Sequence, residues 1–177
     1  MSYKVLNKGD SLDYLEQINK IENRFYFEYK RLIIDYSYLL CDSTNLSCVI
    51  DDSDKLRGFY ITKLVNKNSY LKFKNKKINE TQLLNDKTIY SDDNCLYLIS
   101  AYSLNPKIAS ILLKQNLYDI NLIYDYEKIN FGFSYIHTKS AQRFATRHKV
   151  KSLKNTYFNN HKLFYWNKRT LDRLYNL

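Results

Sequence analysis

Apolar residues recur along the chain with two different periods, and the order of these periods predicts its helices and strands. Near the amino end, Tyr3–Leu6 is expected to form a short strand. Leu12, Leu15 and Ile18 then recur at three-residue spacing, which is typical of one face of a helix. A second helix is expected from about Arg24 to Leu40. This part of the chain therefore predicts one strand followed by two helices.

A β-hairpin is expected next. Cys48–Ile50 and Leu56–Val65 are rich in strand-forming residues, and the acidic, polar DDSDK between them indicates a loop. Gly58, inside the second strand, indicates a bulge. The following segment, 66–93, is rich in Lys and Asn, and its runs SYLKFK and KTIY are expected to be weaker strands.

Strands and helices alternate in the remainder of the chain. Cys95–Tyr102 is a continuous apolar run, so it is the best candidate for a central strand. A helix is expected from Pro106 to about Glu127, a strand over Phe131–Ile136 and a helix from Ala141 to about His148. YFNNHKLFYWNKR then supplies one or two closing strands. The predicted fold is α+β, with layers of helices flanking a mixed, mostly antiparallel central sheet.

Composition indicates one globular domain spanning 1–177. The chain has 177 residues, of which 45% are hydrophobic and 26% charged. Its net charge of +10 is unevenly placed, because residues 1–136 carry 18 basic and 17 acidic side chains. The region 137–177 has 10 basic side chains against one acid, Asp172. This basic C-terminal region predicts either a solvated basic face or contact with an anionic partner.

Cysteine usage and hydropathy bear on the compartment. The three cysteines, Cys41, Cys48 and Cys95, have neither disulfide-type nor zinc-type spacing, which favours a reducing interior. The start of the chain lacks the apolar core of a signal peptide, and no apolar run approaches the length that spans a bilayer. We therefore expect a cytoplasmic protein without a membrane partner. The histidines lack carboxylate or Cys neighbours at ligand spacing, so no metal site is expected.

Three segments resemble the GNAT superfamily of acyl-CoA N-acyltransferases: SCVIDDSDKLRGFYI, CLYLISAYSLNPKIASILL and FSYIHTKSAQRFATRHKV. The resemblance covers about Tyr3 to Lys168. It implies an acyltransferase-like fold and acetyl-CoA or another acyl-CoA as cofactor. It also implies transfer of an acyl group, most simply acetyl, directly to an amine acceptor. Some members of the superfamily act on tRNA-borne amines or on bases, so the implied acceptors include anionic ones.

The same resemblance implies where the cofactor binds. Two strands that separate at Ser100–Tyr102 and at Tyr135–His137 would form the slot for the acyl group. A backbone N–H near Ala101 or Tyr102 would polarise the thioester carbonyl. The turn and helix start after the first strand would hold the pyrophosphate. Of the motif positions Leu104, Lys107 and Ala109, Ala109 fits the family pattern, and Lys107 could contact phosphate directly. Asn105 of this turn and Ser140 at the next helix start complete the expected cofactor contacts.

The catalytic residues implied by the resemblance are partly replaced. Ala141 matches the family pattern, but Ala145 stands where the family often has the Tyr that protonates the thiolate. His148 or Tyr135 could take over that role. A base for the amine is expected near the central strand, where Asp93 and Tyr97 are the candidates beside the adjacent acid Asp92.

Two alternatives remain open. In the first, the chain is a non-catalytic nucleic-acid-binding protein, in which cations meet phosphates and interleaved aromatics stack on bases. The candidate cations are Arg143, Arg147, Lys149, Lys151 and Lys154. In the second, the acyltransferase fold serves as an interaction scaffold.

Overall fold

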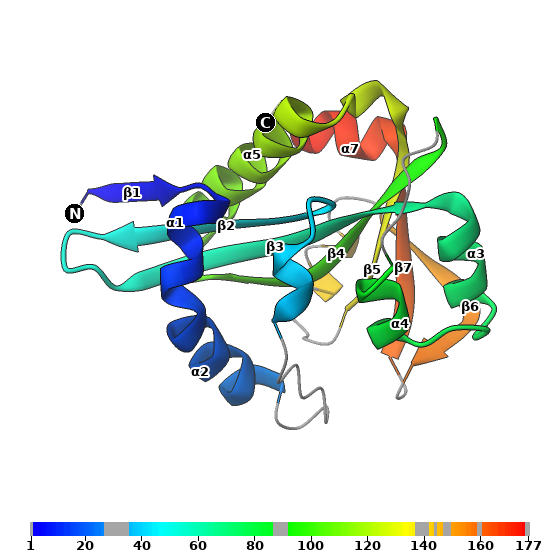
Figure 1. Ribbon diagram of the computed structural model, residues 1–177, viewed down its shortest axis with the longest axis horizontal. Helices are drawn as coiled ribbons and strands as arrows, with labels where there is room; N and C mark the ends of the chain where they lie inside the picture. The colour runs from blue at the N-terminus through cyan, green and yellow to red at the C-terminus, as the bar shows by residue number, and fades with distance from the viewer. Residues whose placement is uncertain are drawn as a thin grey trace.

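Among the residues that the computed structural model describes, seven strands form one sheet in the order β1-β2-β3-β4-β5-β7-β6 (Figure 1). The structure describes residues 2–26, 36–86, 92–136, 142–143, 145–146, 150–158 and 161–175. The strands are β1 (Tyr3–Leu6), β2 (Thr44–Asp51), β3 (Leu56–Asn66), β4 (Asn94–Ser103), β5 (Ile129–Tyr135), β6 (Lys151–Phe158) and β7 (His161–Asn167).

Neighbouring strands are antiparallel except at one place. Only β4 and β5 pair in parallel, while every other neighbouring pair of these described strands is antiparallel. A parallel neighbour needs a crossover connection, and the long helix α5 (Pro106–Ile123) supplies it. The expected mixed, mostly antiparallel sheet flanked by helices is confirmed.

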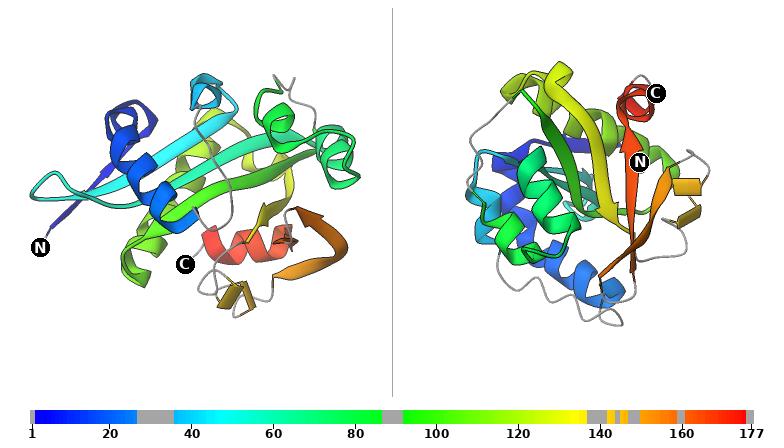
Figure 2. Two further views of the ribbon diagram at one scale, coloured as in Figure 1. Left: turned by 90° about the horizontal axis from the view of Figure 1, so that it is seen from below. Right: turned by 90° about the vertical axis from the view of Figure 1, so that its right-hand side faces the viewer.

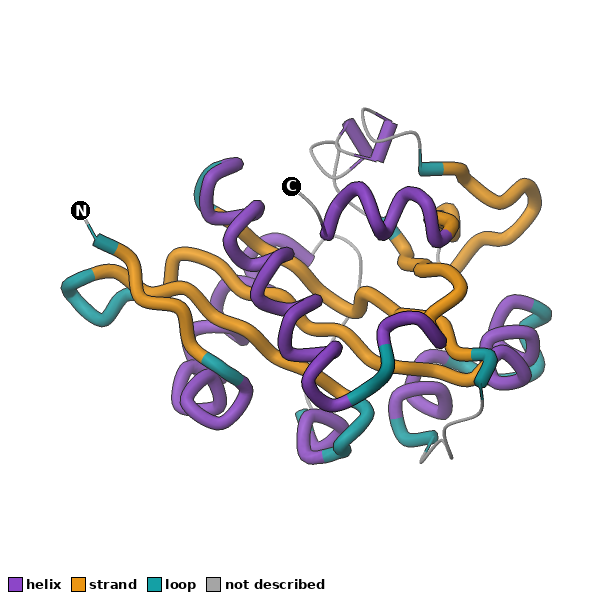
Figure 3. Tube along the Cα trace, turned by 90° about the horizontal axis from the view of Figure 1, so that it is seen from above, coloured by secondary structure: helices purple, strands orange, loops and turns teal. Residues whose placement is uncertain are grey.

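Helices cover both faces of the sheet (Figures 2 and 3). On one face lie α5 and α7, and on the other lie α1 to α4 with two 3₁₀ turns. We call the latter the α1–α4 face. The helical elements are α1 (Lys8–Ser11), η1 (Leu12–Tyr14), α2 (Leu15–Tyr26), η3 (Ser37–Leu40), α3 (Lys67–Lys74), α4 (Glu80–Leu84), α5 (Pro106–Ile123), η4 (Tyr126–Lys128) and α7 (Lys168–Tyr175). None of the described helices has the length and apolar character needed to span a bilayer.

The hydrophobic core is divided by the sheet. The larger cluster lies on the α1–α4 face and includes Phe59, Ile61 and Tyr97, which are fully buried. On the opposite face, Ile108 and Leu112 of α5 pack close to β3 at Gly58. A Cβ at Gly58 would lie 2.7 Å from Leu112 Cδ1 and 2.8 Å from Ile108 Cγ2. The glycine therefore provides the space in which α5 packs against the sheet.

Gly58 also lies beside the irregularity that the sequence predicts. In the β2–β3 ladder, Val49 pairs with Gly58 but Ile50 pairs with Leu56. Arg57 is thus an extra residue in β3, as in a β-bulge. The hairpin itself is confirmed, with a longer first strand than expected.

The segment 66–93 differs most from the sequence expectation. SYLKFK was expected to be a strand, but it lies in α3, and this prediction is wrong. The Asn66 side chain caps this helix by accepting a hydrogen bond from the Ser69 N–H at 2.8 Å, and Tyr70 and Phe73 are buried on one side. KTIY lies outside the described residues. So does most of the predicted helix 24–40, whose last four residues form the 3₁₀ turn η3.

Candidate functional site

The parallel strands β4 and β5 separate part-way along their length. They pair from Asn94–Ile129 to Tyr97–Phe133, and beyond this point the ladder ends although both strands continue. At the point of separation, the Ser134 hydroxyl donates a hydrogen bond to the Leu98 carbonyl at 2.8 Å. The sequence places the opening at Ser100–Tyr102, and in the structure it begins a few residues earlier.

A bulge in β4 coincides with this separation. In the β3–β4 ladder Ile61 pairs with Ser100 but Thr62 pairs with Leu98, so Ile99 is the extra residue. Bulges re-aim side chains and are common next to active sites. Ile99 packs in the core cluster of the α1–α4 face together with Ile61. Ser100 is the cross-strand neighbour of Ile61, and such neighbours share a face, so Ser100 is directed to the α1–α4 face as well.

The side-chain hydroxyl of Ser100 is buried but makes no hydrogen bond to the described residues. Ser100 is 3% exposed, and its Oγ has no hydrogen-bond partner among the described residues. Buried hydroxyls are nearly always hydrogen-bonded. An unpartnered buried hydroxyl therefore lies on β4 just beyond the point where β5 leaves it.

Helix α5 begins directly after β4, and its first turn holds several expected cofactor contacts. Asn105 is the N-cap, and its side chain accepts the Ile108 N–H at 3.0 Å. The Ala109 N–H bonds to the Asn105 carbonyl at 3.1 Å, and Pro106 contributes no N–H. The turn therefore offers an anion fewer backbone donors than an uncapped helix start. The exposed Lys107 adds a cation there.

Tyr97 and Glu80 form an acid–base pair at the end of the β4–β5 ladder. The Tyr97 hydroxyl donates a hydrogen bond to Glu80 Oε1, which comes from the first turn of α4. The Tyr97 ring stacks on Phe133 of β5, with centroids 4.8 Å apart. A tyrosine oxygen whose proton is engaged by a carboxylate can accept a proton from a third group and pass its own to that carboxylate.

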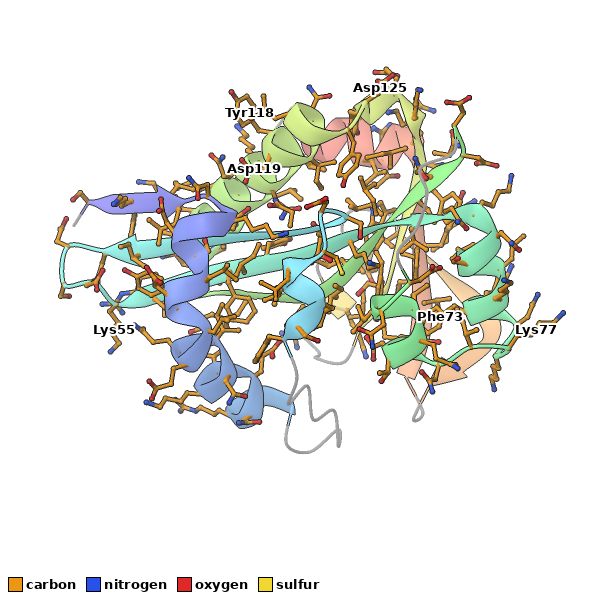
Figure 4. All side chains as sticks on the ribbon, in the orientation of Figure 1. Lys55, Phe73, Lys77, Tyr118, Asp119 and Asp125 are labelled. Atoms are coloured by element: carbon orange, nitrogen blue, oxygen red, sulfur yellow. The ribbon has the colours of Figure 1, made fainter. Side chains whose placement is uncertain are left out.

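Tyr135, near the end of β5, lies on the same face as this pair. It is 8% exposed, and burial, with a smaller contribution from Glu80, raises its pKa to about 12. Its ring packs edge-on against Phe73 of α3 at 5.6 Å, and Figure 4 shows Phe73 directed inward while Lys77 points outward. The structure thus brings the two expected tyrosines, Tyr97 and Tyr135, together on one face.

The acidic candidates lie at the other end of β4. Asp93 precedes the first residue of the strand, where it binds Lys67 Nζ at 2.7 Å and Asn130 Nδ2 at 2.7 Å. The hydrogen bond from Lys67 is the main cause of its lowered pKa. Asp92 is exposed and paired with Lys128 at 2.9 Å. The structure does not bring these acids to the point of strand separation.

The other expected residues are distributed as follows. Ala101 and Tyr102 lie on β4 beyond the bulge, and Leu104 is exposed in the turn before α5. Arg143 and Lys151 are exposed, and Lys154 belongs to β6. His148, Ser140, Arg147 and Lys149 lie outside the described residues. The part of the chain that the structure describes contains no group of three metal-ligating side chains.

Sequence reasoning missed Glu80, and it placed Ser100 at the strand opening without assigning its side chain a role. Glu80 lies in the segment 66–93, where the sequence predicted no helix. The start of its helix does have a sequence signal, because Asn79 and Gln82 form a capping box. Ser100 stands in an apolar run and directly follows a bulge that the sequence of one strand alone cannot indicate.

Comparison with solved structures identifies this arrangement of strands and helices. A GNAT-family acetyltransferase from Staphylococcus aureus Mu50 matches with a TM-score of 0.59 at 14% identity, over 94% of this chain and 99% of that one. Arabidopsis thaliana NAA60 in complex with acetyl-CoA matches with a TM-score of 0.57 at 13% identity, over 94% and 98%. The chain has the GNAT fold. A bacterial toxin matches similarly, with a TM-score of 0.59 at 13% identity over 97% of this chain and 94% of that one.

No protein-family model and no curated protein sequence matches the chain, so its likeness to known proteins is found by comparison of structures. The acyl-CoA N-acyltransferase-like fold expected from the three sequence segments is confirmed.

Proposed function

We propose that the protein is an N-acyltransferase that moves an acyl group, most simply acetyl, from acyl-CoA to an amine. The observation that carries the proposal is the separation of β4 and β5 after Tyr97–Phe133, with the Ile99 bulge at the same place. The GNAT fold supports it, and the similar NAA60 structure is a complex with acetyl-CoA.

The residues at the strand separation fit an acyl-CoA. Beyond Tyr97, β4 is no longer paired with β5, and the Ser100 hydroxyl is buried without a hydrogen-bond partner in the part of the chain that the structure describes. At the start of α5, the exposed Lys107 would contact the phosphates. Its cation compensates for a first turn with few free N–H donors. When bound, the acyl-CoA supplies a thioester carbonyl open to attack by an amine and a thiol that can leave.

The chain's own residues would handle the protons. Tyr97 would accept a proton from the amine while passing its own to Glu80, to which it is already hydrogen-bonded. Tyr135 is the candidate proton donor to the leaving thiolate, in place of the Tyr that Ala145 replaces, because a phenol is protonated at neutral pH. Burial raises the pKa of Tyr135 to about 12, which makes its hydroxyl a weaker acid than an ordinary phenol.

Isothermal titration with acetyl-CoA and with CoA tests this proposal. We expect saturable binding, and we expect Lys107→Glu to raise the dissociation constant about tenfold, because it replaces attraction to phosphate by repulsion. Lys114→Glu, an exposed lysine further along α5, makes the same charge change away from the helix start and should bind normally. Absence of binding, or equal weakening by both substitutions, would contradict the proposed site.

Nucleic-acid binding is the second candidate, favoured by the basic region 137–177 and its single acid. A nucleic acid could be the carrier of the acceptor amine or the partner of a non-catalytic protein. Titration with a short duplex at two salt concentrations separates the cases. Salt-sensitive binding without acetyl-CoA binding would favour the non-catalytic one.

A further inference from the structure

We propose that the Ser100 hydroxyl donates a hydrogen bond to the acyl carbonyl oxygen of the bound thioester. This inference rests on the proposed function and assigns the carbonyl a side-chain partner. It makes Ser100 a catalytic residue, because its Oγ would touch the reacting group.

The first support is the contrast between Ser100 and the other buried strand serines. Ser134 is 4% exposed and donates to Leu98 at 2.8 Å, and Ser47 is fully buried and donates to Asp119 Oδ2 at 3.2 Å. Ser100 is as buried as these two, yet its Oγ has no partner among the described residues. A hydroxyl in this state can engage a ligand oxygen without first breaking a bond to the protein.

The second support is where the hydroxyl lies. The Ile99 bulge immediately precedes Ser100, and β5 has already left β4 at that point. Ser100 is directed to the α1–α4 face, which also carries Tyr97 and Tyr135. The donor therefore shares a face with the groups proposed to handle the amine and thiolate protons.

A serine hydroxyl is suited to hydrogen-bond the carbonyl oxygen of the thioester, not to protonate its sulfur. During transfer the amine nitrogen bonds to the carbonyl carbon, and the carbon–sulfur bond breaks. The amine loses a proton, and the departing thiolate gains one. An alkyl hydroxyl is far too weak an acid to supply that proton at neutral pH. It can, however, keep its own proton and stabilise the negative charge that gathers on the carbonyl oxygen as the amine attacks.

Infrared spectroscopy of bound acetyl-CoA labelled with ¹³C at the carbonyl tests the contact without requiring turnover. A hydrogen bond lowers the carbonyl stretching frequency, so we expect a higher frequency in Ser100→Ala than in the native protein. Ser100→Thr keeps a hydroxyl and should restore the lower frequency. Ser47→Ala removes a buried strand hydroxyl away from the site and should leave the frequency unchanged.

Kinetics provide a second readout once an acceptor amine is found. We expect Ser100→Ala to lower kcat about a hundredfold, as removal of one donor to a developing oxyanion does, with little change in acetyl-CoA affinity. An unchanged carbonyl frequency in a Ser100→Ala protein that still binds acetyl-CoA would overturn the inference while leaving the proposed function intact. Absence of acetyl-CoA binding by the native protein would instead overturn the proposed function, and the inference with it.

Discussion

The absence of a side chain at Gly132 of β5 allows the Trp166 indole to pack against the sheet. Gly132 pairs directly with Trp166 of β7, and the indole lies over the glycine backbone. A Cβ at Gly132 would lie 2.0 Å from Trp166 Nε1 and 2.2 Å from its Cε2, far inside van der Waals contact. The backbone of Gly132 does not have a positive φ. The position therefore requires glycine for space rather than for conformation.

Gly132→Ala should displace the indole and lower the free energy of unfolding by about 1–3 kcal/mol, as overpacking does. The chain has a single Trp, so the change in environment should appear directly in its fluorescence. Gly9→Ala is the matched control, since a Cβ there meets only Asn7 Oδ1 at 3.5 Å. Native stability and emission in Gly132→Ala would show that the indole does not pack on β5 in this way.

Among the elements, the β2–β3 hairpin depends on one carboxylate. Asp51, at the end of β2, accepts hydrogen bonds on Oδ1 from the Ser53 N–H at 2.9 Å and the Lys55 N–H at 3.1 Å. Its Oδ2 accepts from Arg57 Nε at 2.6 Å. Burial alone would raise the pKa of Asp51, but the hydrogen bonds from Ser53, Arg57 and Lys55 outweigh it and hold the pKa well below its usual 3.8. The charged form of Asp51 therefore stabilises the turn.

Asp51→Asn should lower the urea concentration at which the protein unfolds at pH 7, because an amide cannot replace the carboxylate toward Arg57. A carboxylate whose pKa is lowered by folding stabilises the protein above its unfolded pKa, and that contribution is lost as the pH falls. The difference in unfolding urea concentration between Asp51→Asn and the native protein should therefore shrink below about pH 4. Asp13→Asn, at an exposed position, should unfold at the same urea concentration as the native protein both at pH 7 and below about pH 4. A difference that grows in acid would contradict the role of the Asp51 charge.

The elements that the sequence predicted well are those with a strong local pattern. The β2–β3 hairpin, the continuous strand β4 and the helix that begins at Pro106 all follow from apolar period, turn residues or proline position. The segment containing α3 and α4 was misjudged because its apolar residues are few, and packing of Tyr70 and Phe73 decides its helix.

The candidate site was only partly predictable for a related reason. Tyr97 and Tyr135 could be assigned to strands that a GNAT-like order makes neighbours. The Ser100 hydroxyl, which has no partner among the described residues, directly follows the Ile99 bulge, and this bulge is a property of the pairing between β3 and β4. The Glu80–Tyr97 contact joins a short helix to a distant strand, and no pattern in either segment specifies the other.

At the scale of the whole molecule, the sheet consists of two parts joined by a short ladder. Strands β1 to β4 form one antiparallel part, and β5, β7 and β6 form the other. The parts meet through four β4–β5 residue pairs and through helices such as α5 and α7 packed against the sheet. In Figure 1, β5, β7 and β6 lie toward the opposite end of the molecule from the turn of the β2–β3 hairpin.

Hydrogen exchange should distinguish the two parts. Regions with fewer long-range pairings open at lower free energy, so we expect amides of β5, β7 and β6 to exchange faster than those of β2, β3 and β4. Acetyl-CoA bound between β4 and β5 should slow exchange in the second part more than in the first. Uniform exchange through the whole sheet would show that the short ladder does not divide it.

The short ladder has a further consequence if acyl-CoA binds across it. A ligand that binds only the folded state stabilises it by an amount that grows with ligand concentration. The second part of the sheet would then be held in place partly by a metabolite. The protein would resist proteolysis best when acyl-CoA is abundant, and its lifetime would follow the supply of its own cofactor.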